Sequence, residues 1–330
     1  MSKGTPTPPS AGAGADAPCD ATVQSCPLQK SISGRFTETT AKCGDPGHVQ
    51  ADGVKITEGA STTFTITRVR DSAAVASVAA PMNAQAVRDL SWSPKKPAGW
   101  QAGDECQLTV SADGETATGS NRFTFHVYPA AGPETKTIAC ASGVFGWTGK
   151  FDIKCLNDEI TVTVLIKLLN REGPKPAAGV ALPAIGDPVS DADKASMKAD
   201  VEGKLSQKVS LLRKNCAFGE ACSCPRTITI VVSFVEAGAH HEVNLFQGPG
   251  RANATNWTRV KTRDNSWAHE TGHLLGWYDE YVGGAVGTAP RWQPDAAANI
   301  MNVGLTVPPE YGWDFRDWYQ EKSGDEWVAK

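Results

Sequence analysis

The stretch from His269 to Asp279, His-Glu-Thr-Gly-His-Leu-Leu-Gly-Trp-Tyr-Asp, restricts the local fold more than any other part of this chain. Histidines four residues apart share a face on an α-helix, one above the other. Gly276 follows the second histidine by three residues and can adopt a positive φ, which ends a helix. The sequence therefore predicts a helix through both histidines that stops at Gly276 and lets Asp279 turn back toward them.

The residue types in this stretch suit a zinc site with a general base. Two neutral imidazoles, His269 and His273, can bind one tetrahedral zinc ion. Glu270 can aim its carboxylate at the open coordination position and accept a proton from the metal-activated water. A purely structural zinc site normally closes its fourth position and has no use for a base there. The pattern thus predicts a catalytic Zn²⁺ with Glu270 as the general base.

The flanking residues favour a helix in this position. Asp264 and Asn265 are good N-cap residues at its start. Trp267, Leu274 and Leu275 offer an apolar face to a core. We therefore expect a mostly buried helix.

The motif His-Glu-x-x-His-x-x-Gly-x-x-Asp resembles the signature of metzincin zinc peptidases, in the snapalysin-type form with Asp as the third ligand. The resemblance implies that Asp279 completes the metal site and that Tyr281 stabilises the transition state. Metzincins also carry a Met-turn beneath the metal, and the sequence Asn-Ile-Met-Asn at 299–302 matches it. The resemblance implies an α+β zincin fold over roughly residues 135–330, with Met301 as an apolar floor that binds no metal.

A second resemblance leaves the third ligand open. The sequence Val-Pro-Pro-Glu-Tyr at 307–311 is similar to metallopeptidase domains carried by type VI secretion spike proteins of bacteria. In some of these domains the third ligand is a Glu beyond the Ile-Met turn, which would be Glu310 here. Asp279 and Glu310 are therefore alternatives, and the tighter spacing from the helix favours Asp279. As an ordinary residue, Glu310 would be a first-turn helix carboxylate.

Length and charge exclude several classes of function. A chain of 330 residues with 40 % hydrophobic residues can form two globular domains. A net charge of −4 is not the footprint of a nucleic-acid-binding or membrane-surface protein. No apolar run reaches the roughly 18 residues of a membrane helix, so we expect no membrane insertion.

The first half of the chain predicts a flexible arm followed by an all-β domain. Residues 1–30 are rich in Pro, Gly, Ala, Ser and Thr. Residues 31–130 alternate apolar and polar positions in short runs, with turns at Asp113-Gly114 and Gly119-Ser120-Asn121. The pattern predicts an immunoglobulin-like β-sandwich, with strands at 48–56, 61–68, 73–79, 86–92, 105–112 and 122–128.

Residues 131–330 alternate strand and helix patterns and form the predicted peptidase domain. Ser190 begins a long helix, with Asp193 as its capping-box partner and an apolar stripe from Met197 to Leu212. The predicted strands cover 159–168, 227–235, 241–246 and 256–261. We expect 241–246 to be the edge strand that binds an extended substrate.

Nine cysteines are many for a cytosolic protein, and they favour disulfides, with Cys43–Cys106 and Cys140–Cys155 as the expected pairs. The N-terminus has no apolar segment of a secretory signal. Both features would suit a toxin secreted without a classical signal peptide, which acts in the periplasm of a target cell or extracellularly.

The sequence thus predicts a zinc metalloendopeptidase, a secreted antibacterial toxin of the type VI effector kind. Its expected partners are a protein or peptide substrate, a secretion-spike carrier and an immunity protein. Two alternatives belong to other classes. One is a non-catalytic, zinc-stabilised adhesin or carrier-associated binding protein. The other is a zinc amidase that acts on cell-wall peptides.

Overall fold

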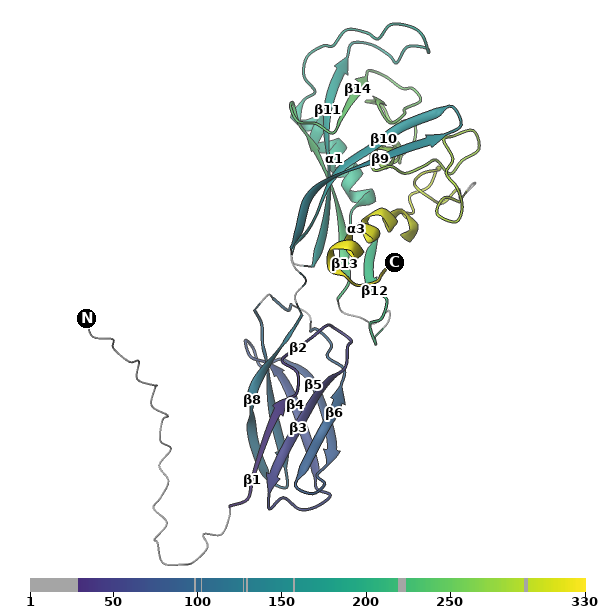
Figure 1. The fold of residues 1–330 in the computed structure, drawn as a ribbon. Coiled ribbons are helices and arrows are strands. Elements are labelled where there is room, and N and C mark those ends of the chain that lie inside the picture. Colours follow the sequence, from purple (N-terminus) through teal and green to yellow (C-terminus); the bar gives the residue numbers. More distant parts are fainter. Residues whose placement is uncertain are drawn as a thin grey trace, which may run out of the picture.

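The computed structural model describes residues 29–330 apart from 98, 102, 127, 129, 157, 219–223 and 294–295. The predicted N-terminal arm lies outside the described residues up to residue 28. Strands dominate the described residues (Figure 1). Buried hydrophobic residues form two separate clusters, one within residues 32–125 and the other within 151–327. The chain is therefore β-rich and multidomain, as its sequence predicts.

The first cluster lies between two sheets. The smaller sheet has the order β1-β3-β6 and the larger one β2-β8-β7-β4-β5. Inward-facing residues alternate with outward-facing ones along the central strands, as in β7, where every second residue is buried. The strands are β1 Ser31–Phe36, β2 Thr40–Ala41, β3 Gly47–Val54, β4 Ser61–Arg68, β5 Ala74–Pro81, β6 Ala86–Trp92, β7 Cys106–Ala112 and β8 Glu115–Phe125.

The turn predicted at 119–121 is wrong, because these residues lie inside β8. The side-chain amide of Asn121 makes the two hydrogen bonds that a backbone peptide group would make in a strand pair. Its Oδ1 accepts from Phe36 N at 2.8 Å, and its Nδ2 donates to Phe36 O at 2.9 Å. Gly119 lets the neighbouring strand approach, since a Cβ there would lie 2.8 Å from Leu108 Cβ. Residues typical of turns therefore serve here to join β8 to β1.

The second cluster surrounds a sheet with the order β15-β14-β11-β13-β12-β16, and the β9–β10 hairpin pairs with β11. The central strand β11 is parallel to β13 and β14 and antiparallel to β10. The strands are β9 Ala131–Ser142, β10 Phe145–Leu156, β11 Glu159–Arg171, β12 Ser210–Arg213, β13 Arg226–Phe234, β14 His241–Phe246, β15 Asn256–Thr258 and β16 Trp327–Ala329.

Strand β14 has the predicted bounds, but it is not an edge. It lies between β11 and β15, because Asn256–Thr258 pairs in parallel with its outer side. The hairpin β9–β10 was not predicted, and it projects from the sheet as a long ribbon (Figure 1).

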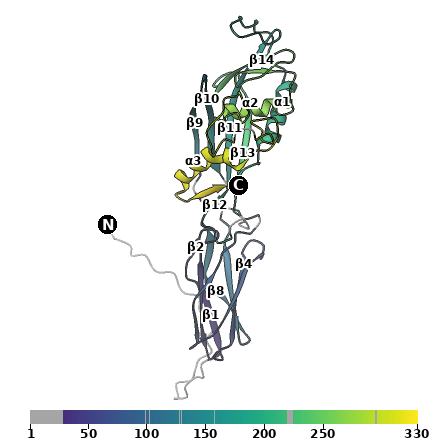
Figure 2. The same cartoon turned by 90° about the vertical axis from the view of Figure 1, so that its right-hand side faces the viewer.

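Helix α1, Asp191–Leu205, begins at the predicted cap, where Ser190 Oγ accepts from Asp193 N at 3.1 Å. It ends at Leu205, so the predicted extension of its apolar stripe to Leu212 is wrong; Leu212 belongs to β12. Helix α2, Ser266–Leu274, packs between α1 and the β9–β10 ribbon (Figure 2). Helix α3, Trp313–Ser323, follows the 3-10 helix η2, Pro309–Gly312. Among the described residues, no helix is long and apolar enough to cross a membrane.

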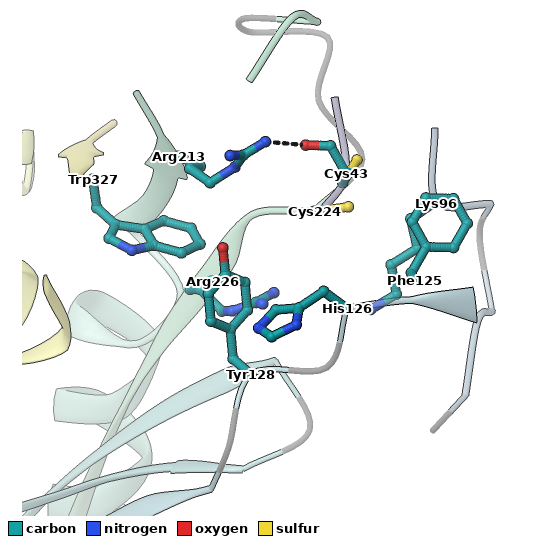
Figure 3. A pocket seen from close by; sticks show the side chains of 9 residues that line it. All are labelled: Cys43, Lys96, Phe125, His126, Tyr128, Arg213, Cys224, Arg226 and Trp327. Atoms are coloured by element: carbon teal, nitrogen blue, oxygen red, sulfur yellow. Dashed lines mark hydrogen bonds between the residues drawn. The ribbon is translucent and has the colours of Figure 1, made fainter. Parts of the chain in front are cut away.

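Polar contacts join the two parts of the chain at one end of each. Arg213 Nη2 donates to Cys43 O at 2.6 Å (Figure 3). The same atom donates to Asp45 Oδ1 at 2.6 Å. Lys42 Nζ lies 2.6 Å from Asp325 Oδ1. The Arg226 guanidinium lies over the Tyr128 ring, 5.0 Å from its centroid. The junction thus combines ion pairs with cation–π contacts.

Both expected disulfide pairs are wrong. Cys140 and Cys155 are free thiols; the hairpin register sets Cys140 opposite Trp147 and Cys155 opposite Ala131. Cys106 is a free thiol in the core of the first cluster. Cys19, Cys26 and Cys222 lie outside the described residues.

We expect Ile166→Ala to lower the free energy of unfolding of the second part by about 2–5 kcal/mol, because it leaves a cavity in the middle of the sheet. Ile166 is fully buried in β11 and pairs with both β13 and β14. The measurement is denaturant unfolding followed by tryptophan fluorescence. Val144→Ala is the matched control, since that side chain is 96 % exposed at the tip of the hairpin. Equal effects of the two substitutions would contradict the assigned core.

Candidate metal centre

Helix α2 carries both histidines of the motif on one buried face. It ends at Leu274, and Gly276 follows with a φ of +88°, as the sequence predicts. A Cβ at Gly276 would also come within 3.1 Å of Ile138 in β9. The end of the helix is therefore fixed by backbone conformation and by the hairpin that packs on it.

Each histidine is oriented by a backbone carbonyl. His269 Nδ1 lies 2.9 Å from Ile300 O, and His273 Nδ1 lies 2.8 Å from Trp277 O. A carbonyl oxygen can only accept, so each Nδ1 carries the proton in these contacts. An imidazole that binds a metal in this orientation therefore does so through Nε2.

The two Nε2 atoms face the same carboxylate oxygen. Asp279 Oδ1 lies 3.1 Å from His269 Nε2 and 3.2 Å from His273 Nε2. It is buried and has no hydrogen-bond partner among the described residues. Three potential ligand atoms therefore converge, with both Nε2 atoms within 3.2 Å of Asp279 Oδ1, which is an arrangement that a cation can occupy. Two imidazoles and one carboxylate suit Zn²⁺, with a position left open for reaction.

The loop after the helix holds Asp279 in place. Ala285 N donates to Asp279 Oδ2 at 2.7 Å, and Asp279 N donates to Ala285 O at 3.0 Å. Gly284 must be small, because a Cβ there would lie 2.6 Å from Asp279 Oδ2. Burial raises the pKa of Asp279, but His269 and His273 outweigh it and hold the pKa well below its usual range. The carboxylate is therefore ionised and ready to bind a cation.

Glu270 lies beside the two histidines on the same helix and is 6 % exposed. Its Oε2 is buried without a hydrogen-bond partner. Burial raises the pKa of Glu270 to about 7, although the neighbouring His269 acts to lower it. Donor atoms of Glu270, His269 and His273 all lie within 4.8 Å of one another, so Glu270 could also touch a cation. Asp279 is the better ligand, since its oxygen faces both Nε2 atoms directly.

The 299–302 turn lies directly beneath the helix. Its Ile300 carbonyl binds His269, and Met301 packs against Gly272, where a Cβ would lie 2.4 Å from Met301 Sδ. Asn265 makes no side-chain cap to the helix, in contrast to its predicted role. Its Nδ2 instead donates to carbonyls of the turn, at 3.0 Å from Ile300 O and 3.1 Å from Asn302 O.

Glu280, next to Asp279, is a buried hub that the motif does not include. Its Oε1 accepts from Gln293 N at 2.9 Å, and its Oε2 accepts from Asn299 Nδ2 at 2.7 Å and Tyr311 Oη at 2.8 Å. Burial raises the pKa of Tyr311, and the Glu280 charge raises it further, so the hydroxyl stays a donor. The acidic pair Asp279-Glu280 was the only signal of this role in the sequence.

Tyr281 lies near His269, with 6.1 Å between the two ring centroids. Its hydroxyl accepts a hydrogen bond from Arg251 Nη2 at 3.2 Å. Burial raises the pKa of Tyr281, with Asp279 acting in the same direction, so the phenol keeps its proton. The hydroxyl proton is thus available to a group in the cleft.

Glu310 occupies the second residue of η2 and is partly buried. It is not among the residues that line the cleft around the histidines. The assignment of the third ligand nevertheless stays a prediction until metal binding is measured.

An open cleft leads to the site, with about 1010 Å³ of empty space, part of it open to solvent. The hairpin forms one wall through Trp147, whose Nε1 donates to His273 O at 2.9 Å. The loop at 251–255 and Lys175 also line this cleft. His269, Glu270 and Tyr281 all face this space. The cleft can therefore admit an extended polypeptide to Glu270 and to the converging atoms of His269, His273 and Asp279.

No protein-family model matches this chain, and no curated protein matches it.

We expect Glu270→Gln to stabilise the metal-free protein above pH 7 and to have little effect near pH 4.5. The unfolded carboxyl titrates near 4.5 and the folded one near 7. Between these values the folded state holds a proton that the unfolded state has lost, so wild-type stability falls as pH rises and levels off above 7. The difference between variant and wild type should grow by roughly 3 kcal/mol across this window.

The measurement is chemical unfolding in a chelating buffer at several pH values. Glu242→Gln is the matched control, because its side chain is 61 % exposed. A pH-independent difference for Glu270→Gln would contradict a carboxylate buried without a partner.

Proposed function

We propose that the protein is a zinc-dependent endopeptidase of the metzincin type. In this proposal the second part of the chain is a zincin domain, and the first is an immunoglobulin-like sandwich. The single observation that supports it best is the convergence of His269 Nε2, His273 Nε2 and Asp279 Oδ1 beside the buried carboxylate of Glu270. We assign the two histidines and Asp279 as the ligands of Zn²⁺.

The mechanism follows from the chemistry of these side chains. A bound zinc ion supplies Lewis acidity and lowers the pKa of water from about 15.7 toward 7. Glu270 Oε2 takes the proton of the attacking water and then delivers it to the nitrogen of the leaving amine. Burial raises the pKa of Glu270 to about 7 in the metal-free protein. A bound cation would lower this pKa, so Glu270 would be ionised and able to accept the proton at neutral pH. The Tyr281 hydroxyl donates to the oxyanion that develops on the scissile carbonyl.

The setting of this activity is part of the proposal. We propose a secreted antibacterial toxin that acts in the periplasm of a target cell or in the extracellular space. Its partners would be a protein or peptide substrate, a secretion-spike carrier and an immunity protein. The open cleft supports a polypeptide substrate, because it exposes the site along the hairpin and the 251–255 loop.

We expect Glu270→Gln to retain one equivalent of zinc and to lose proteolytic activity by about 10²–10⁴-fold, because the base is removed while the ligands stay. The measurements are metal content by mass spectrometry and digestion of casein and a peptide library. Glu242→Gln should match the wild type in both. Full proteolysis by Glu270→Gln would contradict the role of Glu270 as the base.

The same assays separate the two rival functions. A zinc-stabilised binding protein would hold the metal and cleave no peptide. A cell-wall amidase would release fragments from purified peptidoglycan and leave casein intact. Cleavage of casein by the wild type, and its loss in Glu270→Gln, would exclude both.

We expect Asp279→Ala to lose zinc and Glu310→Ala to keep it, since the Asp279 oxygen faces both histidines and Glu310 does not line the cleft. The measurement is zinc affinity by competition with a chromophoric chelator. Circular dichroism would show that each variant is folded. Retention of zinc by Asp279→Ala together with its loss from Glu310→Ala would assign Glu310 as the third ligand instead.

A further inference from the structure

Two cationic side chains, Lys175 and Arg251, line the cleft beside Glu270 and Tyr281. Lys175 follows β11, and its Nζ donates to Arg251 O at 2.7 Å. Arg251 Nη2 donates to the Tyr281 hydroxyl. The two segments, far apart in sequence, are therefore tied together at the wall that faces the histidines.

Neither cation has a carboxylate within 4.0 Å among the residues that the structure describes. Some cations of the same part of the chain do have one, since Lys204 pairs with Asp200 and Arg291 with Asp314, whereas Arg171 in β11 contacts only amide and carbonyl oxygens among the described residues. The contacts of Lys175 and Arg251 are a backbone carbonyl and a phenol. Burial also lowers the pKa of Lys175, so its ammonium lacks part of its hydration.

A bound divalent ion would change the net charge around Lys175 and Arg251. A divalent ion on the histidines and Asp279 would cancel the charges of Asp279 and Glu270. Lys175 and Arg251 would then give the cleft an excess of positive charge. Lys175 is partly shielded from water and therefore interacts with an anion more strongly than a cation on an open surface, whereas Arg251 is exposed.

We infer that Lys175 and Arg251 form a subsite for a substrate carboxylate, so that the protein cleaves peptides beside an acidic residue or a free C-terminus. This inference rests on the proposed peptidase function. Arg251 contacts the hydroxyl that we assign to the oxyanion, and an extended peptide rises by about 3.3 Å per residue. The carboxylate therefore belongs to a residue within about two positions of the scissile bond.

The test uses binding, so that it does not depend on turnover. The full chain with Glu270→Gln, loaded with zinc, is titrated calorimetrically with alanine-based hexapeptides. One set has a single Glu or Gln at each position in turn with an amidated C-terminus. A second pair has no Glu and ends in a free or an amidated C-terminus. We expect the preferred carboxylate peptide to bind about tenfold to a hundredfold more tightly than its amide counterpart.

Substitutions in the same background show whether these two residues cause the preference. Lys175→Gln and Arg251→Gln should each bring the ratio of affinities toward one, and Arg251→Glu should favour a Lys-containing peptide. Lys194→Gln on α1 and Arg88→Gln in β6 are matched controls that should keep the ratio. Circular dichroism would show that the loop variants are folded.

The outcomes separate the subsite from the peptidase proposal. Equal binding of acid and amide peptides, or an unchanged ratio in both loop variants, would overturn the subsite even if the wild type digests casein. A carboxylate preference that the variants abolish would support the subsite. If the wild type then cleaves no peptide, the subsite stands and the peptidase proposal fails. The first peptide set identifies a side-chain acid, and the second pair identifies a C-terminal carboxylate.

Discussion

The buried carboxylate of Glu280 connects the segments that build the site. Its side chain accepts from Gln293, Asn299 and Tyr311, which belong to three separate segments. Its backbone N donates to Met301 O at 2.9 Å, and its O accepts from Asn302 Nδ2 at 2.6 Å. Hydrogen bonds to a charged group are worth about 1.5–3 kcal/mol each. Asp279 is the next residue, so the position of the third donor atom depends on this hub.

The 299–302 turn also fixes the position of helix α2. Ile300 O orients the His269 ring, and Met301 fills the space that Gly272 leaves open. The Asn265 amide holds the turn from the other side through Ile300 O and Asn302 O. The helix, the turn and the Asp279 loop are thus mutually fixed. The geometry of the donor set is therefore a property of all three, and of no single motif residue.

The sequence predicted the parts of this arrangement that depend on local chemistry. Histidine spacing, Gly276 and the Ser190 cap each act within a few residues, and the structure confirms the helix, its end and the cap. Contacts between residues far apart in the chain could not be predicted from the sequence. Asn121 is typical of a turn, but in the structure it pairs with Phe36. Strand β14 was predicted as an edge, but Asn256–Thr258 pairs with its outer side. Glu280 was missed as a hub because its partners are 13–31 residues away in the chain.

The burial of the Glu270 carboxylate has a cost in stability that is relevant to the role of the site. A buried carboxylate without a hydrogen-bond partner destabilises the fold once it is ionised, and its pKa of about 7 reflects this cost. A purely structural metal site would gain stability from an apolar residue at this position, because three other donors already converge. In the proposed peptidase, the carboxylate of Glu270 would lie where a proton acceptor can reach the open coordination position of the metal. Such unfavourable burial is typical of groups that act in chemistry, since it tunes the proton affinity to the working pH.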